Sequence, residues 1–170
     1  MTDRPYNILF LCTGNSARSI IGEALVDKLG EGRFRGFSAG SNPKGQVHPM
    51  ALDILGGMGF ATDGLRSKSW KEFSGPDAPQ MDFIFTVCDN AAGESCPVWP
   101  GKPITSHWGL PDPAAVEGEG QREAFLETLR ALRHRLELFF ELPLASIDKM
   151  SLANSIRTIG NNATQQESPA

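Results

Sequence analysis

The stretch Tyr6-Asn-Ile-Leu-Phe-Leu-Cys-Thr-Gly-Asn-Ser-Ala-Arg-Ser19 joins the pattern of a strand to those of a loop and a helix. Its first part, Tyr6–Leu11, is almost wholly apolar, which is typical of a short buried strand. The residues that follow are small and turn-prone, and apolar side chains then recur at helical spacing as far as Gly30. The stretch therefore predicts a β-loop-α unit.

The rest of the chain alternates between strand and helix patterns. Further apolar runs predict strands at Phe34–Ala39, Asp82–Val87 and, more weakly, Ile104–Trp108. Helical spacing predicts helices at His48–Gly57, Glu119–Glu141 and Ala145–Ile159, with a short helix ending at Phe73. This alternation predicts an α/β fold: a single doubly wound domain with a four-stranded parallel sheet flanked by helices.

The length of 170 residues suits one compact domain with its own core. We expect this domain to span residues 1–145, followed by a C-terminal helical extension at 146–159. Residues 160–170 are small and polar and cannot bury enough surface to order themselves, so they are predicted to form a disordered tail.

The charge and apolar content exclude several classes of function. A net charge of −4 argues against nucleic acid or an anionic membrane as a partner. The longest apolar run, Ile8–Cys12, is too short for a membrane span or a signal-peptide core. A cytoplasmic monomer is therefore expected. In that compartment, three cysteines are more typical of reactive thiols than of a disulfide framework.

The loop after the first strand has the composition of an anion-binding site. Ligands of parallel sheets bind outside the carboxyl ends of the strands, where Cys12, Cys88 and the loop His107–Pro113 all fall. Loop amides and a helix N-terminus favour a tetrahedral anion, and Arg18 can fold back to add a charged fork. The residues expected to bind the anion are Thr13, Gly14, Asn15, Ser16, Ala17, Arg18 and Ser19.

The same positive field predicts a depressed pKa for Cys12, which would make it a nucleophile at neutral pH. The alternative is a buried cysteine beside a helix that happens to begin with arginine.

Asp112 lies between two prolines, which stiffen its loop and can hold the carboxyl group in one direction, although Asp-Pro is also a common turn.

Cys88 and Cys96 can each be explained without a role in catalysis. Cys88 ends the third predicted strand and can be a packing residue, while Cys96, eight residues on, can be incidental. A zinc site made of Cys88, Cys96 and His107 is disfavoured, because the spacing is wrong and a fourth ligand is missing.

Several segments together resemble a known family. The Cys12-x5-Arg18-Ser19 loop directly after the first strand resembles the low-molecular-weight protein tyrosine phosphatases, whose sheet has a flavodoxin-like strand order. Four further segments resemble the arsenate reductases built on that fold: Phe37-Ser-Ala-Gly-Ser41, Leu65-Arg-Ser-Lys-Ser-Trp70, Val87-Cys-Asp-Asn-Ala-Ala-Gly-Glu-Ser-Cys-Pro-Val-Trp-Pro-Gly101 and His107-Trp-Gly-Leu-Pro-Asp-Pro-Ala114. The resemblance covers about residues 6–145.

The resemblance implies an arsenate reductase that serves arsenic detoxification. Cys12 would form a thiol–arsenate adduct stabilised by Arg18 and the loop amides, and Asp112 would be the general acid. Attack by Cys88 on Cys12 would release arsenite, and Cys96 would then move the disulfide to Cys88–Cys96. The resemblance implies no bound cofactor. The implied partner is an external thiol reductant, with thioredoxin favoured and glutathione with glutaredoxin possible.

In some members of the family a cation lies behind the anion loop. Asn15, Glu23 and Ser38 correspond to part of its shell, but the remaining acidic position is not matched, because the chain reads Ser67-Lys68-Ser69 there. A lysine ammonium can replace such a cation, so no metal is expected.

Two other functions stay open. A phosphatase would hydrolyse phosphomonoesters through a phosphorylated Cys12, with Asp112 as the acid. A non-enzymatic module would only sense oxyanions or redox state. Cys88 separates the first of these from a reductase, because a hydrolase has no use for it.

Overall fold

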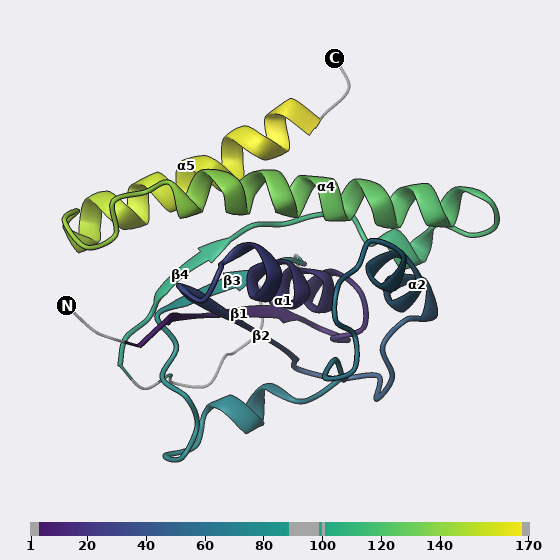
Figure 1. The fold of residues 1–170 in the computed structure, drawn as a ribbon, viewed down its shortest axis with the longest axis horizontal. Coiled ribbons are helices and arrows are strands. Elements are labelled where there is room, and N and C mark those ends of the chain that lie inside the picture. The colour runs from purple at the N-terminus through teal and green to yellow at the C-terminus, as the bar shows by residue number, and fades with distance from the viewer. Residues whose placement is uncertain (1–3, 89–98, 100, 168–170) are drawn as a thin grey trace.

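The computed structural model describes residues 4–88, 99 and 101–167, with side chains described as far as residue 161. Its centre is a four-stranded parallel sheet in the order β2-β1-β3-β4 (Figure 1). The strands are β1 (Tyr6–Cys12), β2 (Phe34–Gly40), β3 (Phe83–Thr86) and β4 (Ile104–His107). The predicted fold class and strand order are therefore confirmed.

Helices and short 3-10 turns connect the strands. The elements are α1 (Arg18–Leu29), α2 (Pro49–Gly57), η1 (Trp70–Phe73), η2 (Pro113–Ala115), α4 (Gly120–Phe140) and α5 (Lys149–Glu167). In Figure 1, α4 and α5 run side by side above the sheet, with α1 between α4 and the strands. Across the described residues, no helix has the length and apolar character needed to cross a membrane.

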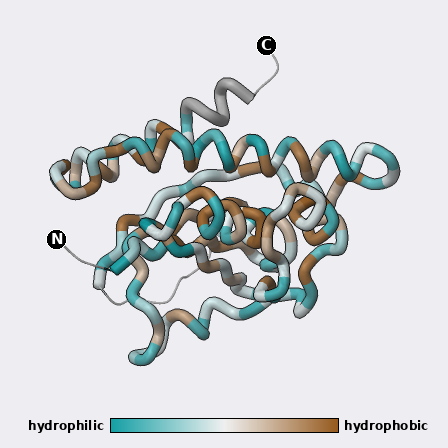
Figure 2. The backbone as a smooth tube through the Cα atoms, viewed as in Figure 1, coloured by the Kyte–Doolittle hydropathy of each residue, from teal (hydrophilic) through white to brown (hydrophobic). Residues whose placement is uncertain are grey.

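The sheet divides the core into two layers, because successive side chains of a strand point to opposite faces. Ile8 and Phe10 of β1 belong to the larger cluster, which the helices cover. Leu9 and Leu11 belong to a smaller cluster that η1 covers through Phe73. Figure 2 shows apolar residues concentrated along the strands and inner helix faces. Each fully buried side chain of this kind contributes about 1.5–3 kcal/mol.

The C-terminal helix differs from the prediction. α5 begins at Lys149 and continues to Glu167, past residue 160, where the sequence predicts a disordered tail. Ile156 and Ile159 are buried in the main core, and Gly160 is buried beside Trp108. The composition of residues 160–170 does not predict the contact with Trp108. The residue that makes it is a glycine, which adds no apolar side chain to the sequence pattern.

Candidate functional site

The anion loop lies between the end of β1 at Cys12 and the start of α1 at Arg18. Asn15 has a left-handed φ of 46°, a conformation that asparagine tolerates better than most residues. No side chain caps the N-terminus of α1, so the first amides of this helix are not occupied by the helix's own residues. This is the arrangement that the sequence predicts.

A neighbouring segment, Ser41–His48, holds the carbonyl groups of the loop. The carbonyl oxygens of Thr13, Gly14 and Ser16 accept hydrogen bonds from the backbone of Asn42, Lys44 and His48 at 2.9–3.0 Å. In a trans peptide the N–H points opposite to the C=O, so these bonds turn the loop amides away from that segment. The Gly14 amide correspondingly bonds the sulfur of Cys12. The sequence gives no signal for this anchoring.

The end of β2 comes unusually close to the loop. A Cβ on Gly40 would lie 2.4 Å from the carbonyl oxygen of Thr13, so only glycine fits there. Glycine at this position therefore allows the Ser41–His48 segment to reach the loop carbonyls.

Arg18 bridges the anion loop and the loop that contains the predicted acid. Its Nη1 donates to the carbonyl oxygen of Leu110 at 2.9 Å, and its Nη2 lies 3.9 Å from Oδ2 of Asp112. The side chain is 14% exposed, and its buried Nε has no hydrogen-bond partner among the described residues. Because buried donors are normally paired, this N–H is available to an anion beside the loop.

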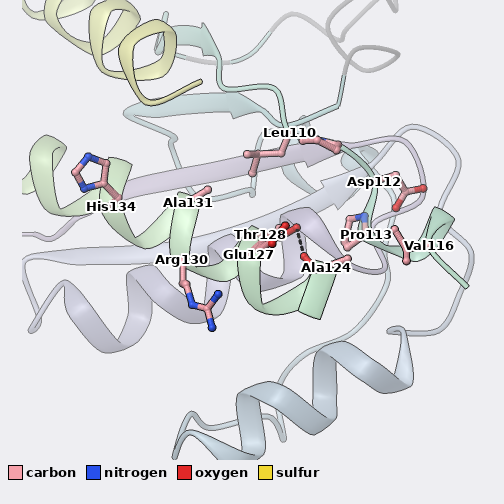
Figure 3. Close-up of a pocket in the computed structure, with 11 residues that line it drawn as sticks. Leu110, Asp112, Pro113, Val116, Ala124, Glu127, Thr128, Arg130, Ala131 and His134 are labelled. Atoms are coloured by element: carbon pink, nitrogen blue, oxygen red, sulfur yellow. Dashed lines mark hydrogen bonds between the residues drawn. The ribbon is translucent and has the colours of Figure 1, made fainter. Parts of the chain in front are cut away.

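Asp112 lies at the mouth of the site. Its side chain is 44% exposed, and Oδ1 accepts a hydrogen bond from the Ala114 amide at 3.0 Å, so the carboxylate also caps η2. The residues between β4 and η2, which include Asp112, are called the acid loop. A cavity of about 520 Å³ lies between this loop and α4 (Figure 3). Cys12 does not line it, so the cavity is separate from the anion loop.

Cys12 and Cys88 lie together as buried thiols at the ends of neighbouring strands. The two side chains are in hydrogen-bond contact, and the Cys88 sulfur also lies 3.5 Å from Oγ1 of Thr13. The remaining predicted thiol, Cys96, lies outside the described residues.

The prediction of a depressed pKa for Cys12 is wrong for this arrangement. The contact with Cys88 and burial raise the pKa of Cys12, whereas Arg18 and the Gly14 amide lower it by less. The sequence shows Arg18 but does not show a second thiol against the first. Removal of the Cys12 proton is therefore a step that the reaction itself must provide.

A buried lysine lies behind the anion loop. Lys68 Nζ lies 3.5 Å from Glu23 Oε1 and 3.3 Å from Ser38 Oγ, and donates to the Arg66 carbonyl at 2.6 Å. Burial raises the pKa of Glu23 and lowers that of Lys68, and the pairing opposes both shifts. The ammonium thus occupies the position where the family resemblance implies a cation shell.

Asn15 connects this lysine to the loop. Its Oδ1 accepts from the Lys68 amide and its Nδ2 donates to Ser19 Oγ, both at 2.8 Å. The hydroxyl of Ser19, one of the residues expected to bind the anion, is therefore bonded to Asn15. No group of three or more His, Cys, Asp or Glu side chains suited to a metal occurs in the described part.

We expect Lys68→Met to lower the free energy of unfolding by about 3–5 kcal/mol, because it leaves the Glu23 carboxylate without its cationic partner and, among the described residues, with only the Ser38 hydroxyl bonded to it. Urea denaturation measures the change. The exposed Lys71→Met is the matched control and should stay within about 0.5 kcal/mol of the parent. Adding Glu23→Gln to Lys68→Met should recover part of the loss. A double variant as unstable as the sum of the single changes would contradict the pairing.

The chain is similar to proteins of a known family. A family model described as low molecular weight phosphotyrosine protein phosphatase matches residues 7–152. The chain belongs to this family. An arsenate reductase of Bacillus licheniformis is 33% identical over 137 residues, which cover 79% of this chain and 94% of that protein. An arsenate reductase of Bacillus subtilis is 30% identical over 136 residues, with the same coverage.

Solved structures of the family agree with the fold. An arsenate reductase in its phosphate-binding state matches with a TM-score of 0.66 at 26% identity, covering 79% of this chain and 96% of that one. A thioredoxin-dependent arsenate reductase of Corynebacterium glutamicum matches with a TM-score of 0.58 at 25% identity. That match covers 81% of this chain and 63% of the other.

Proposed function

We propose that this protein reduces arsenate to arsenite for arsenic detoxification, with Cys12 and Cys88 as the redox pair. The observation that supports this most is the buried thiol of Cys88 in contact with Cys12 at an oxyanion loop. Hydrolysis of a phosphomonoester, the background chemistry of the family, has no step for that second thiol. The names of the relatives point the same way.

In the first step Cys12 attacks the arsenic of bound arsenate. Arsenate is itself a base, so it can take the thiol proton that the raised pKa of Cys12 retains. One oxygen of arsenate leaves as water, after Asp112 passes to it a proton taken from the acid form of the bound oxyanion. The product contains a Cys12–arsenic bond with arsenic still pentavalent, and Arg18 and the loop amides stabilise its negative charge.

In the second step the sulfur of Cys88 attacks the sulfur of Cys12, and the Cys88 proton passes to an oxygen of the departing arsenite. The sulfur–arsenic bond breaks and its electron pair stays on arsenic, which leaves as arsenite. The two thiols are oxidised to a disulfide while arsenic gains two electrons, so the step balances. Cys96 then attacks Cys88, freeing Cys12 and forming a Cys88–Cys96 disulfide that an external dithiol can reduce.

We assign thioredoxin as the favoured reductant and the cytoplasm as the compartment. A relative of known structure is described as thioredoxin-dependent. The cytosol also keeps thiols reduced, which a relay that starts from two thiols requires.

We expect Cys96→Ser to reduce thioredoxin-coupled arsenate turnover to background while leaving a single arsenite release per protein intact. The first two steps use only Cys12 and Cys88, whereas regeneration uses Cys96. Thioredoxin oxidation and arsenite release measure the two parts, with Ser95→Ala as the neighbouring control. Recovery of turnover with glutathione and glutaredoxin would assign Cys96 to the thioredoxin route. Unchanged thioredoxin-coupled turnover would contradict the shuttle.

A further inference from the structure

The acid loop is held on its inner side by the C-terminal helix. α5 packs along α4 and against β4, the edge strand that leads into the loop (Figure 1). Trp108, the first residue after β4, is wholly buried at this junction. Its indole N–H donates to the Ile156 carbonyl oxygen of α5 at 3.2 Å.

Trp108 is fixed on its other sides as well. Its ring stacks on Phe85 of β3, with centroids 4.0 Å apart and planes at 8°. Its amide donates to the Thr86 carbonyl at 2.7 Å, and its carbonyl accepts from the buried Arg135 of α4 at 2.9 Å. Trp108 is therefore fixed by contacts with β3, α4 and α5. A shift of this residue would also shift the chain that follows it.

The chain that follows contains the functional groups. Leu110, two residues after Trp108, donates its amide to the Val87 carbonyl at 3.1 Å and accepts from Arg18 through its own carbonyl at 2.9 Å. Asp112 follows two residues later. The position of Trp108 therefore sets the position of the Arg18 acceptor and of the acid.

Gly160 allows α5 to lie flat on this tryptophan. A Cβ at Gly160 would lie 2.7 Å from Cδ1 and 3.1 Å from Nε1 of Trp108, closer than packed atoms approach. The tryptophan is too tightly packed to give way, so a side chain at residue 160 must push α5 or the loop. Ile156 and Gly160 both lie beyond residue 152, the last that the family model matches.

We propose that α5 is a brace that positions the acid loop, with Ile156 and Gly160 acting as positioning residues through Trp108. The brace sets where Asp112 protonates the leaving oxygen. This inference rests on the role proposed above for Asp112, and it adds a determinant of rate outside the residues that the family model matches.

The test uses Gly160→Ala in the full chain. Alanine favours helix by about 1 kcal/mol over glycine, so the change stabilises α5 by itself while displacing it from Trp108. Asn161→Ala is the matched control, because this exposed neighbour in α5 also gains helix propensity. Arsenite release in a single turnover, with pre-reduced protein and excess arsenate, reports the chemical steps without the external reductant.

We expect Gly160→Ala to slow single turnover about tenfold or more, since a general acid contributes about 10²–10⁴-fold and works only when placed. Asn161→Ala should leave the rate unchanged. Faster hydrogen exchange at the Trp108 and Leu110 amides should accompany the slow variant. A rate for Gly160→Ala equal to that of Asn161→Ala would overturn the brace.

A double-variant cycle separates positioning from general damage. In an Asp112→Asn background, Gly160→Ala should cost less further rate than it does in the parent, because the acid is already gone and only the effect through Leu110 and Arg18 remains. An undiminished additional loss would show damage elsewhere and would overturn the proposal. Full activity of Asp112→Asn alone would instead contradict the acid assigned above, so the two failures are distinguishable.

Discussion

Replacing Cys88 with serine should remove arsenate reduction almost completely, by at least about 10³-fold, as the loss of an essential nucleophile does. Serine keeps the approximate size of the side chain and its polar contact with Thr13, but it cannot form a disulfide. The Cys12 adduct would then have no route for passing two electrons to arsenic. Steady-state arsenite release with excess reductant measures the effect.

The same variant provides its own control. Hydrolysis of an aryl phosphate needs only Cys12, Arg18 and Asp112, so Cys88→Ser should keep whatever phosphatase activity the parent has. Cys12→Ser should lose both activities. Arsenate turnover that survives Cys88→Ser would contradict the relay and favour a protein whose chemistry is that of a phosphatase.

Replacing Arg18 with alanine should lower kcat/KM for arsenate about 10²–10³-fold, the effect of removing one charged donor from an oxyanion site. The guanidinium is mostly buried beside the loop, and its Nε has no hydrogen-bond partner in the part of the chain that the structure describes, whereas the protein as a whole has a net charge of −4. Attraction of the anionic substrate must therefore be local. Inorganic phosphate, as a competitive ligand, gives the binding part of the loss by calorimetry.

Arg130→Ala is the matched control. Arg130 also lies near the acid loop, on α4, but it is exposed and paired with Glu123 (Figure 3). Its removal should change kcat/KM less than about threefold, because an exposed charge is screened by solvent. Similar losses for Arg18→Ala and Arg130→Ala would show that attraction is not local. The kcat/KM of Arg18→Lys should lie between those of Arg18→Ala and the parent, because lysine keeps the positive charge but lacks the two-pronged guanidinium.

The β1-loop-α1 unit could be predicted because strand and helix patterns are properties of sequence neighbours. The same holds for the strands, for α4 and for the place of Cys12, Cys88 and Asp112 at the carboxyl ends of the sheet. The mistaken pKa of Cys12 had a different origin. Arg18 is visible six residues away in sequence, whereas the opposing contact comes from Cys88, on another strand.

The pairing of Lys68 with Glu23 shows the same limit. The residues are 45 positions apart, and their charges matter because both are buried. Burial depends on which elements pack together, which no local pattern reports. The Ser41–His48 segment that orients the loop amides is polar and irregular, so its role depends wholly on where the fold places it.

The amino-acid order alone specifies the parallel sheet, the oxyanion loop and the chemical types at its rim, because these follow from periodicity and from short-range spacing. Tertiary structure decides how those groups behave. Contact between Cys12 and Cys88 sets the thiol pKa, Lys68 fills the space behind the loop, and Gly160 seats α5 on Trp108. Each of these depends on distance and burial between residues far apart in the chain, and only the folded protein brings such residues together.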